Sequence, residues 1–575
     1  MALMIKRIER PRELKWYQAG AMLYGDWGTS KAYVLGIAFA LAGHASWFLL
    51  GIMSLLTILV GFCYTIICRV YPDGGGVYSS LRNRSKPLAV LGALLLIADY
   101  AVTASLSTLS AFHYFNTSNP VLFAMGAIAL IGAINWIGPS KSGNLATFVG
   151  VLASISAIIL FGFTVPHLPH VNLQMPTGTF THNWSSFVGI VLALSGVEAI
   201  ANMTGVMVLP VDKTSKRAIW PVLLEVALLT FLLGIAMNAI PNLTGHTEDM
   251  LRAIANHYIA PWYGTMISIL FAFLLLSATN SAINGLVSIK YAMGKDRELP
   301  EQFTQLNRFG MPWLGLIVAT IVPILVLFFV NDLVGLAALY AIGVVGAITI
   351  NLGACALNYK INLKRWERSL LYAASLILLF VEVTIAFQKH AALLFAIIIV
   401  AVGLILRYLG KTFFVIKVPE FVPSAEVLTV SEAKDLVSLY KSSFLVAIKQ
   451  MNLKLLEDTA LMIKARGENS AYVCYVEESP AIKSELVELE PSAESIELLA
   501  KVEEEMAKSG ITVIPLWQTG TEPGKRIAET AKELDVKTVT IGATQRSALV
   551  NLFRGDVLRQ LAQGLQKDCH LVIVG

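Results

Sequence analysis

Acidic side chains stand inside long apolar stretches of the sequence, among them Asp26, Asp99 and Glu198. A charge at membrane depth costs several kcal/mol and usually has a function. Thr103 and Ser107 follow Asp99 at steps of four residues, which places the three on one helix face. Two carboxylates with hydroxyl groups and unwound backbone carbonyls suit a hard monovalent cation. One carboxylate could instead carry a proton, because desolvation disfavours its charged form.

Further polar residues at the same depth extend this candidate site. Tyr33, Ser195 and Tyr340 supply hydroxyl groups, and Tyr24 and Lys31 flank Asp26 in the first apolar stretch. A carboxylate substrate fits poorly, because Asp26 stands where such a substrate would require free backbone amides. We therefore expect a transported monovalent cation, with no other metal ion and no required cofactor.

These residues belong to a chain whose two parts differ in composition. Only 14% of its 575 residues are charged, against about 25% in a typical soluble domain, and 56% are hydrophobic. The first 410 residues hold 41 charges, whereas the last 165 hold 42. This pattern indicates a membrane body followed by a soluble domain, and it excludes a single soluble enzyme. Five cysteines without a CxxC pair argue against a disulfide framework or a structural zinc site.

Twelve apolar segments of the membrane body are long enough to cross about 30 Å of hydrocarbon. They are 17–41, 46–69, 87–114, 120–138, 144–165, 184–209, 218–240, 262–290, 313–331, 333–357, 368–387 and 390–409. If the N-terminus is cytoplasmic, the outside loops carry only Arg252 and Lys389 as basic residues. This bias predicts a multi-pass protein of the cell membrane with both termini in the cytoplasm.

Glycine and an acidic residue interrupt the first and the sixth segment. The interruptions read Gly25-Asp26-Trp27-Gly28-Thr29-Ser30 and Ser195-Gly196-Val197-Glu198. A glycine kink for helix packing is the simpler interpretation, but the carboxylate in each break favours a substrate site. Broken helices five positions apart predict two inverted five-helix repeats with the site between them. The expected protein is an α-helical transporter and not an enzyme.

The last part of the chain has the texture of a soluble α/β domain. Strand-like runs at 444–448, 471–476, 511–517, 538–541 and 570–574 alternate with helical patterns at 453–466, 492–508, 522–534 and 551–566. Such alternation predicts a doubly wound parallel sheet. The predicted domains are thus a transporter over 1–410, a linker over 411–440 and a cytoplasmic α/β domain over 441–575.

The motifs of the membrane body resemble those of a known transporter family. Tyr24-Gly25-Asp26-Trp27-Gly28-Thr29-Ser30, followed by Tyr33, resembles the first-helix signature of the KUP/HAK/KT potassium uptake permeases of the amino acid–polyamine–organocation (APC) superfamily. Other motifs resemble the Kim-type importers of that family: Tyr71-Pro72-x-Gly74-Gly75-Gly76-x-Tyr78, Asp99-Tyr100, Leu194-Ser195-Gly196-Val197-Glu198-Ala199-Ile200 and Leu339-Tyr340-Ala341. The resemblance implies a LeuT-like fold, proton-coupled potassium import by alternating access, and a homodimer.

The resemblance also implies roles for individual residues. The residues that would surround the potassium path are Asp26, Tyr33, Asp99, Thr103, Ser107, Ser195 and Tyr340. Asp26 and Asp99 would accept the cation or a proton, and Lys31, Glu198 and Tyr24 are the candidates for gating or coupling.

Lys31 departs from the family pattern, which has an uncharged residue there. Its ammonium could occupy a cation position itself, which would argue against potassium transport. Alternatively it points to the outer vestibule, because it stands five residues beyond Asp26, about 140° around a helix. We favour the vestibule, where Lys31 would pair with an acidic group and gate access.

The soluble domain resembles a universal stress protein (UspA-like) domain, which the Kim-type importers also carry. Nucleotide-binding members have a loop of the form G-x2-G-x9-G-[ST] after the fourth strand. Here it reads Gly542-x2-Gln545-x9-Gly555-Asp556, so a glycine and a hydroxyl residue are replaced. A carboxylate repels a phosphate. An adenine nucleotide effector held at Gly542 and Gly555 therefore stays open, beside a regulatory or dimerising role without nucleotide.

The sequence as a whole predicts a proton-coupled potassium importer with a regulatory or dimerising cytoplasmic domain. The alternative is an APC-type permease for amino acids or other organic solutes, most of all cationic ones. The expected partners are potassium, protons, the lipid bilayer and a second copy of the chain, and no nucleic acid.

Overall fold

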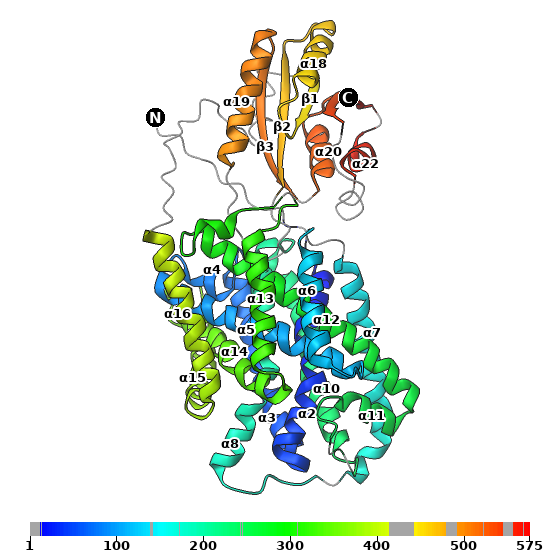
Figure 1. The fold of residues 1–575 in the computed structure, drawn as a ribbon, viewed down its shortest axis with the longest axis vertical. Coiled ribbons are helices and arrows are strands. Elements are labelled where there is room, and N and C mark those ends of the chain that lie inside the picture. The colour runs from blue at the N-terminus through cyan, green and yellow to red at the C-terminus, as the bar shows by residue number, and fades with distance from the viewer. Residues whose placement is uncertain are drawn as a thin grey trace.

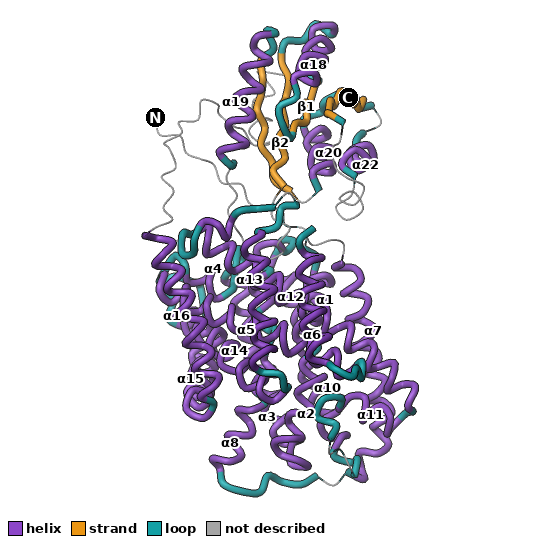
Figure 2. The backbone as a smooth tube through the Cα atoms, in the orientation of Figure 1, coloured by secondary structure: helices purple, strands orange, loops and turns teal. Residues whose placement is uncertain are grey.

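The computed structural model contains a helical body and an α/β unit (Figures 1 and 2). It describes residues 12, 14–137, 142–171, 173–241, 243, 245–307, 309–412, 442–478, 491–520, 522–543, 556–566 and 568–574. The predicted linker therefore lies almost wholly outside the described residues.

Helices cover all twelve of the apolar segments identified in the sequence. They are α1 (Trp16–Trp27), α2 (Ser30–Ala42), α3 (Ser46–Val70), α5 (Lys86–Tyr114), α6 (Pro120–Asn135), α7 (Ser142–Thr164), α8 (Phe180–Gly189), α9 (Ala199–Asn202), α10 (Val211–Met237), α12 (Pro261–Lys295), α13 (Trp313–Phe329), α14 (Leu333–Ala356), α15 (Arg365–Gln388) and α16 (His390–Thr412). Among the described residues, eight helical stretches have the length and apolarity to span a membrane, or nine with the bent pair 180–206. One of them, Trp16–Val70, contains α1, α2 and α3, while α6 and α13 are shorter apolar helices.

The segment 184–209 is broken, as the sequence predicts, and consists of α8, two short 3-10 turns and α9. Two other details of the helical body differ from the sequence expectation. Helix α10 begins at Val211, seven residues before the apolar run, because its first two turns carry charged residues outside that run. The short helices α4 (Val77–Leu81) and α11 (Met250–Tyr258) are additional, since neither reaches the length of a span.

Side-chain hydroxyls stabilise the break between α1 and α2. Gly28 ends α1, and a Cβ there would lie 2.6 Å from the ring and the carbonyl of Tyr24. Thr29 Oγ1 donates to the carbonyl of Asp26 at 2.6 Å, and Ser30 Oγ donates to that of Trp27 at 2.8 Å. A helix can be broken inside a membrane only where released backbone groups find such partners.

The second break, between α8 and α9, lies directly against the first. The helical stretches Phe180–Gly189 and Val191–Val206 bend by 41° relative to each other. Gly196 has a φ of +92°, which a glycine adopts without strain. A Cβ at Gly196 would lie 2.8 Å from the backbone nitrogen of Trp27. The Trp27 indole donates to the carbonyl of Ala193 at 3.2 Å. The two broken helices are therefore in backbone contact at the level of Asp26.

Helices α5 and α14 form the interior of the body. In each, 78% of the most apolar stretch is buried within the protein, against 17% in α16 and 33% in α15. Gly343 of α14 faces the backbone of Asp99 so closely that a Cβ would lie 2.7 Å from its nitrogen. Helices α15 and α16 lie on one flank of the body, and α7 and α11 on the other (Figure 1).

The α/β unit is a five-stranded parallel sheet, as the sequence predicts, and its strands lie in the order β3-β2-β1-β4-β5. Its strands are β1 (Phe444–Ile448), β2 (Ser470–Glu478), β3 (Thr512–Gly520), β4 (Thr538–Gly542) and β5 (His570–Val574). Helices α18 (Leu453–Ala465) and α19 (Ala493–Lys508) cover one face, and α20 (Pro523–Glu533) and α22 (Val557–Gly564) the other. Buried apolar side chains fill both faces, which is typical of a parallel sheet.

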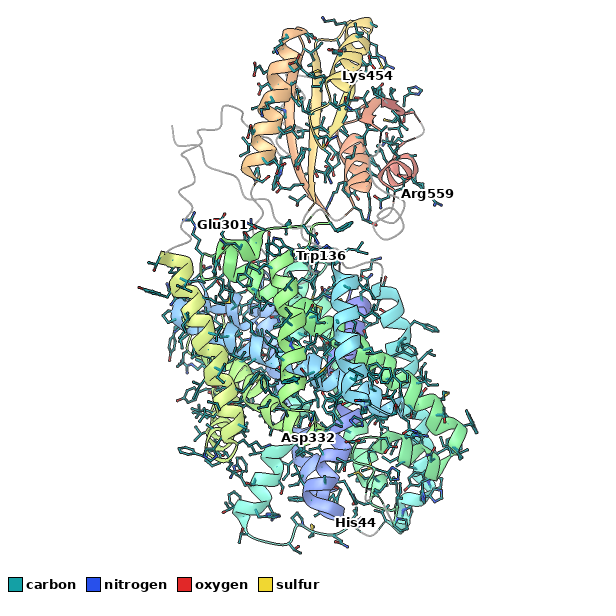
Figure 3. The ribbon with its side chains drawn as sticks, in the orientation of Figure 1. His44, Trp136, Glu301, Asp332, Lys454 and Arg559 are labelled. Carbon is teal, nitrogen blue, oxygen red and sulfur yellow. The ribbon has the colours of Figure 1, made fainter. Side chains whose placement is uncertain are left out.

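A buried acidic residue joins the ends of α12 and α16. Glu298 is 3% exposed and accepts from Arg407 and from Lys411, whose ammonium lies at 3.1–3.2 Å. Burial alone would raise the pKa of Glu298, but the bonds and charges of these two cations outweigh it and lower the pKa. This contact lies near Glu301, at the end of the body that faces the α/β unit (Figure 3).

We expect Glu298→Gln to lower stability by about 1–3 kcal/mol at neutral pH, because two charged hydrogen-bond donors lose their acceptor charge. Because the pKa of Glu298 is lower in the folded protein, the charged side chain stabilises the fold fully above the pKa of the unfolded state, about 4.3. This stabilisation is lost as the pH falls through the pKa of the folded state. The difference in melting temperature between wild type and variant should thus shrink on acidification below that range. A difference that stayed constant with pH would contradict the ion cluster.

Candidate cation site between the broken helices

Three carboxyl groups from three elements meet beside the helix breaks. Asp26 comes from the end of α1, Asp99 from the middle of α5 and Glu198 from the turn before α9. Asp99 and Glu198 are 1% and 6% exposed, and Asp26 is partly buried. Asp99 and Glu198 interact through their side chains, and Glu198 and Asp26 lie close enough for their charges to interact. In the part of the chain that the structure describes, none of the three forms an ion pair.

Hydroxyl groups of α5 and α14 border Asp99. Thr103 Oγ1 lies 2.9 Å from Tyr340 Oη and 3.3 Å from Asp99 Oδ1, and it also donates to the carbonyl of Asp99 at 2.9 Å. The two hydroxyl hydrogens of Thr103 and Tyr340 cannot fill all three contacts at once, so lone pairs of this cluster stay available. Such a cluster of oxygens is able to receive a cation or an additional proton.

Carboxylate oxygens at the centre of the site lack protein partners. Asp26 Oδ1 and Asp99 Oδ2 are buried and accept no hydrogen bond from a described residue. One oxygen of Glu198 is engaged, since the Gly196 N–H donates to its Oε2 at 3.1 Å. Neighbouring ionised acids in a low-dielectric interior repel one another. No basic residue in the described part of the chain neutralises these three.

The remaining residues expected at the site lie around this cluster. The ring hydroxyl of Tyr33, on α2, lies near Thr29 and within electrostatic range of all three carboxyl groups. Ser195 lies in the break before Glu198, and Ser107 lies one turn beyond Thr103; both are buried. No hydrogen bond among the described residues joins either serine hydroxyl to the carboxylates.

Lys31 and Tyr24 form a separate group with Glu225 of α10. The Lys31 ammonium lies 2.7 and 2.8 Å from the two Glu225 carboxylate oxygens and 3.2 Å from Tyr24 Oη. The Lys31 side chain is 0% exposed and that of Glu225 10%. The expected acidic partner is therefore present, but the expected position in an outer vestibule is wrong. No described contact joins Lys31 to the three carboxyl groups, so it does not occupy their site.

Sequence reasoning missed one neighbour of Asp26. Ser281, in the middle of α12, lies beside the Asp26 side chain. The signal was present as a run of small polar residues, Ser277-Ala278-Thr279-Asn280-Ser281, inside an otherwise apolar span. The partnership of Glu225 with Lys31 joins residues 194 positions apart and has no local signal.

The glycine-rich loop after α3 closes against the second broken helix. The Gly75 N–H donates to Ala201 O at 3.0 Å and to Thr204 Oγ1 at 3.1 Å. Asn351 of α14 donates to Gly75 O at 3.0 Å and accepts from Ser80 of α4 at 2.9 Å. The loop thus connects the helix that carries Glu198 with the helix that carries Tyr340.

The α/β unit has its own cavity, of about 490 Å³, at the carboxyl ends of β1 and β4. These strands are the point where the strand order reverses, which is the usual ligand position in doubly wound sheets. Gly542 lines the cavity, whereas Gln545 and Gly555 lie outside the described residues. Asp556 caps α22 by accepting from the Leu558 N–H at 2.9 Å. The nucleotide-binding pattern has a serine or threonine at this position. The Asp556 carboxylate can cap the helix in the same way as such a hydroxyl, so α22 still begins here.

Two relatives share parts of the sequence with this chain and have names that concern potassium. The probable potassium transport system proteins Kup 2 of Sinorhizobium medicae and Kup 1 of Agrobacterium fabrum are each 29% identical, over 31% and 26% of this chain. These matches span only 34% and 26% of the relatives' own length. An uncharacterized protein of Methanocaldococcus jannaschii, MJ0609, is 26% identical over 51% of this chain and 71% of its own.

Family and structure comparisons cover both parts of the chain. Residues 445–572 match the universal stress protein family. A universal stress protein of Archaeoglobus fulgidus is 20% identical in its structural alignment, which covers 23% of this chain and 97% of that one with a TM-score of 0.18. Residues 14–417, which include both helix breaks and the three carboxyl groups, match the amino acid permease family. This chain is therefore a member of the amino acid permease family that carries a universal stress protein domain after its helical body.

Proposed function

We propose that this chain is a proton-coupled potassium importer that works by alternating access. The observation that carries the proposal is the meeting of Asp26, Asp99 and Glu198 without a basic partner among the described residues. Potassium and a proton together neutralise two of the three charges. The similarity to two proteins named as potassium transporters supports this choice of cation.

We assign the cation and the proton to different carboxyl groups. Asp26 Oδ1 and Asp99 Oδ2 are the oxygens without protein partners, so they are the cation ligands together with Thr103 and Tyr340. Glu198 is the proton carrier, because its carboxylate accepts from the Gly196 N–H at the break and interacts with Asp99. Its protonation would then be linked both to cation binding and to the shape of the second broken helix.

The architecture proposed for this function has twelve membrane spans in a LeuT-like arrangement. Breaks in the first and sixth apolar segments support two inverted five-helix repeats. We propose that the end of the body near Trp136 and Glu301 faces the cytoplasm and that His44 lies at the outer end (Figure 3). Both termini are cytoplasmic in this proposal. A homodimer in the cell membrane completes the proposal.

For the α/β unit we propose a regulatory role with an adenine nucleotide as effector. The cavity between β1 and β4 supports a ligand of this size. Asp556 lies at the start of α22, where a phosphate would otherwise bind, so its charge disfavours the phosphates.

A permease for amino acids is the second candidate, because the matching family carries that description. Uptake of a labelled cationic amino acid into proteoliposomes, without uptake of rubidium as a potassium tracer, would replace the potassium proposal.

We expect Asp26→Asn and Asp99→Asn each to weaken the apparent affinity for rubidium at least tenfold, about 1.4 kcal/mol, because each removes a cation ligand's charge. Uptake into proteoliposomes as a function of rubidium concentration measures this. The matched control is Glu382→Gln on α15, an acidic residue of the membrane body with no place in the proposed site, which should leave uptake unchanged. Wild-type affinity in both aspartate variants would contradict the assigned site.

Glu198→Gln should uncouple transport from the proton gradient. Glutamine still accepts the Gly196 N–H hydrogen bond but cannot ionise. Exchange of rubidium across the membrane should continue, while accumulation driven by an inward proton gradient falls at least tenfold. If the variant accumulates rubidium with the pH dependence of the wild type, Glu198 is not the proton carrier.

Asp556→Asn should strengthen the binding of ATP to the full-length protein several-fold and leave adenosine binding unchanged. Asparagine keeps the helix cap and removes the charge that repels phosphate. Calorimetric titration of both variants with both ligands measures the difference. Equal ATP affinities, or no binding of either ligand, would argue against the proposed effector site.

A further inference from the structure

The ammonium of Lys31 is enclosed by oxygen atoms close to the first helix break. Both Glu225 carboxylate oxygens and the Tyr24 hydroxyl lie between 2.7 and 3.2 Å from it. Tyr24 Oη also donates to Glu225 Oε1 at 3.0 Å, which orients both groups. The ring of Tyr24 lies 4.9 Å from the ammonium and adds a cation–π contact.

Stability alone does not account for this arrangement. A buried ion pair contributes little more than well-packed apolar residues of the same volume, because desolvation offsets its attraction. The charges of Lys31 and Glu225 also cancel each other. Lys31 contacts none of the three carboxyl groups of the proposed transport site. What distinguishes it is position: Tyr24 precedes the break, Lys31 follows it, and Glu225 of α10 contacts both.

The oxygens around the ammonium are those that a free monovalent cation prefers. A carboxylate and a phenol hydroxyl beside a helix break provide charge and lone pairs for an ion of ammonium size, and potassium is of similar size. We propose that Glu225 and Tyr24 form a second monovalent-cation site, in which the Lys31 ammonium is the permanently tethered occupant. The wild-type protein then binds no free co-ion there, and the charge of this site stays constant.

A purely structural clamp between α1, α2 and α10 makes a different prediction. A clamp depends on the covalent link between the ammonium and α2, so no free cation can replace it. A tethered cation can be replaced by a free one once the lysine side chain has been shortened, provided that Glu225 keeps its charge.

The test uses the purified full-length Lys31→Ala variant and its melting temperature in choline, potassium, sodium and methylammonium salts. We expect the variant to melt several degrees lower than wild type in choline. Potassium and methylammonium should restore most of this loss in a saturable manner, because ligands that bind only the folded state stabilise it. The wild type should show only the response that potassium binding at the proposed transport site gives, so the test measures the additional response of Lys31→Ala.

Two further variants make the test specific. Lys31→Ala/Glu225→Gln lacks the acidic ligand and should show no cation response beyond that of the wild type. Lys31→Met fills the position of the ammonium with an apolar group, and should likewise respond no more than the wild type. A Lys31→Ala variant that ignores all cations, or a double variant that responds equally, would overturn the proposal.

Should Lys31→Ala fail to fold in choline, its recovery as a monodisperse species from membranes solubilised in each salt replaces the melting curve. Recovery in potassium or methylammonium alone supports the site, and failure in every salt overturns it. Only the consequence for coupling, that rubidium uptake by the wild type needs no second cation, rests on the proposed function. The melting and recovery measurements do not involve transport, so their failure is distinguishable from a failure of the potassium proposal.

Discussion

The electrostatic repulsion among Asp26, Asp99 and Glu198 is the constraint on which the rest of the structure depends. Like charges at short range in a low-dielectric interior raise each other's free energy, and no basic residue of the described chain compensates them. The acids can therefore be retained only if protons or cations neutralise them in part. The broken helices fit this requirement, because they bring backbone groups of Gly196 and hydroxyls of α5 and α14 to the same place.

The helical body contains acidic residues of two electrostatic kinds. Glu225 has its counter-charge built into the chain as Lys31, so its charge state need not change during a cycle. Asp26 and Asp99 have none among the described residues, so theirs must depend on what binds. A similar division exists at the end of the body, where Glu298 is matched by Arg407 and Lys411. Matched acids fix the helices relative to one another, whereas Asp26 and Asp99 stay available for a bound cation or proton.

Much of the fold could be predicted because its causes are local. Apolar length revealed the helices, and alternation with turn residues revealed the strands of the parallel sheet. The start of α10 was predicted too late, because the apolar criterion ignores charged turns such as those of Lys213 and Lys216. At the site, Asp26 and Glu198 were visible as acids next to glycines, whereas Ser281 and the pairing of Lys31 with Glu225 depend on the approach of helices distant in sequence. No local sequence pattern shows which distant helices approach one another.

The loop at Gly75 has a consequence for the energetics of shape change. It is held to Ala201 and Asn351 by backbone and amide hydrogen bonds, and the neighbouring Asp73 forms an ion pair with Arg12. Water can replace such partners at little net loss, since a typical intramolecular hydrogen bond contributes only about 1 kcal/mol. Under the proposed alternating access, release of this loop would therefore need little free energy.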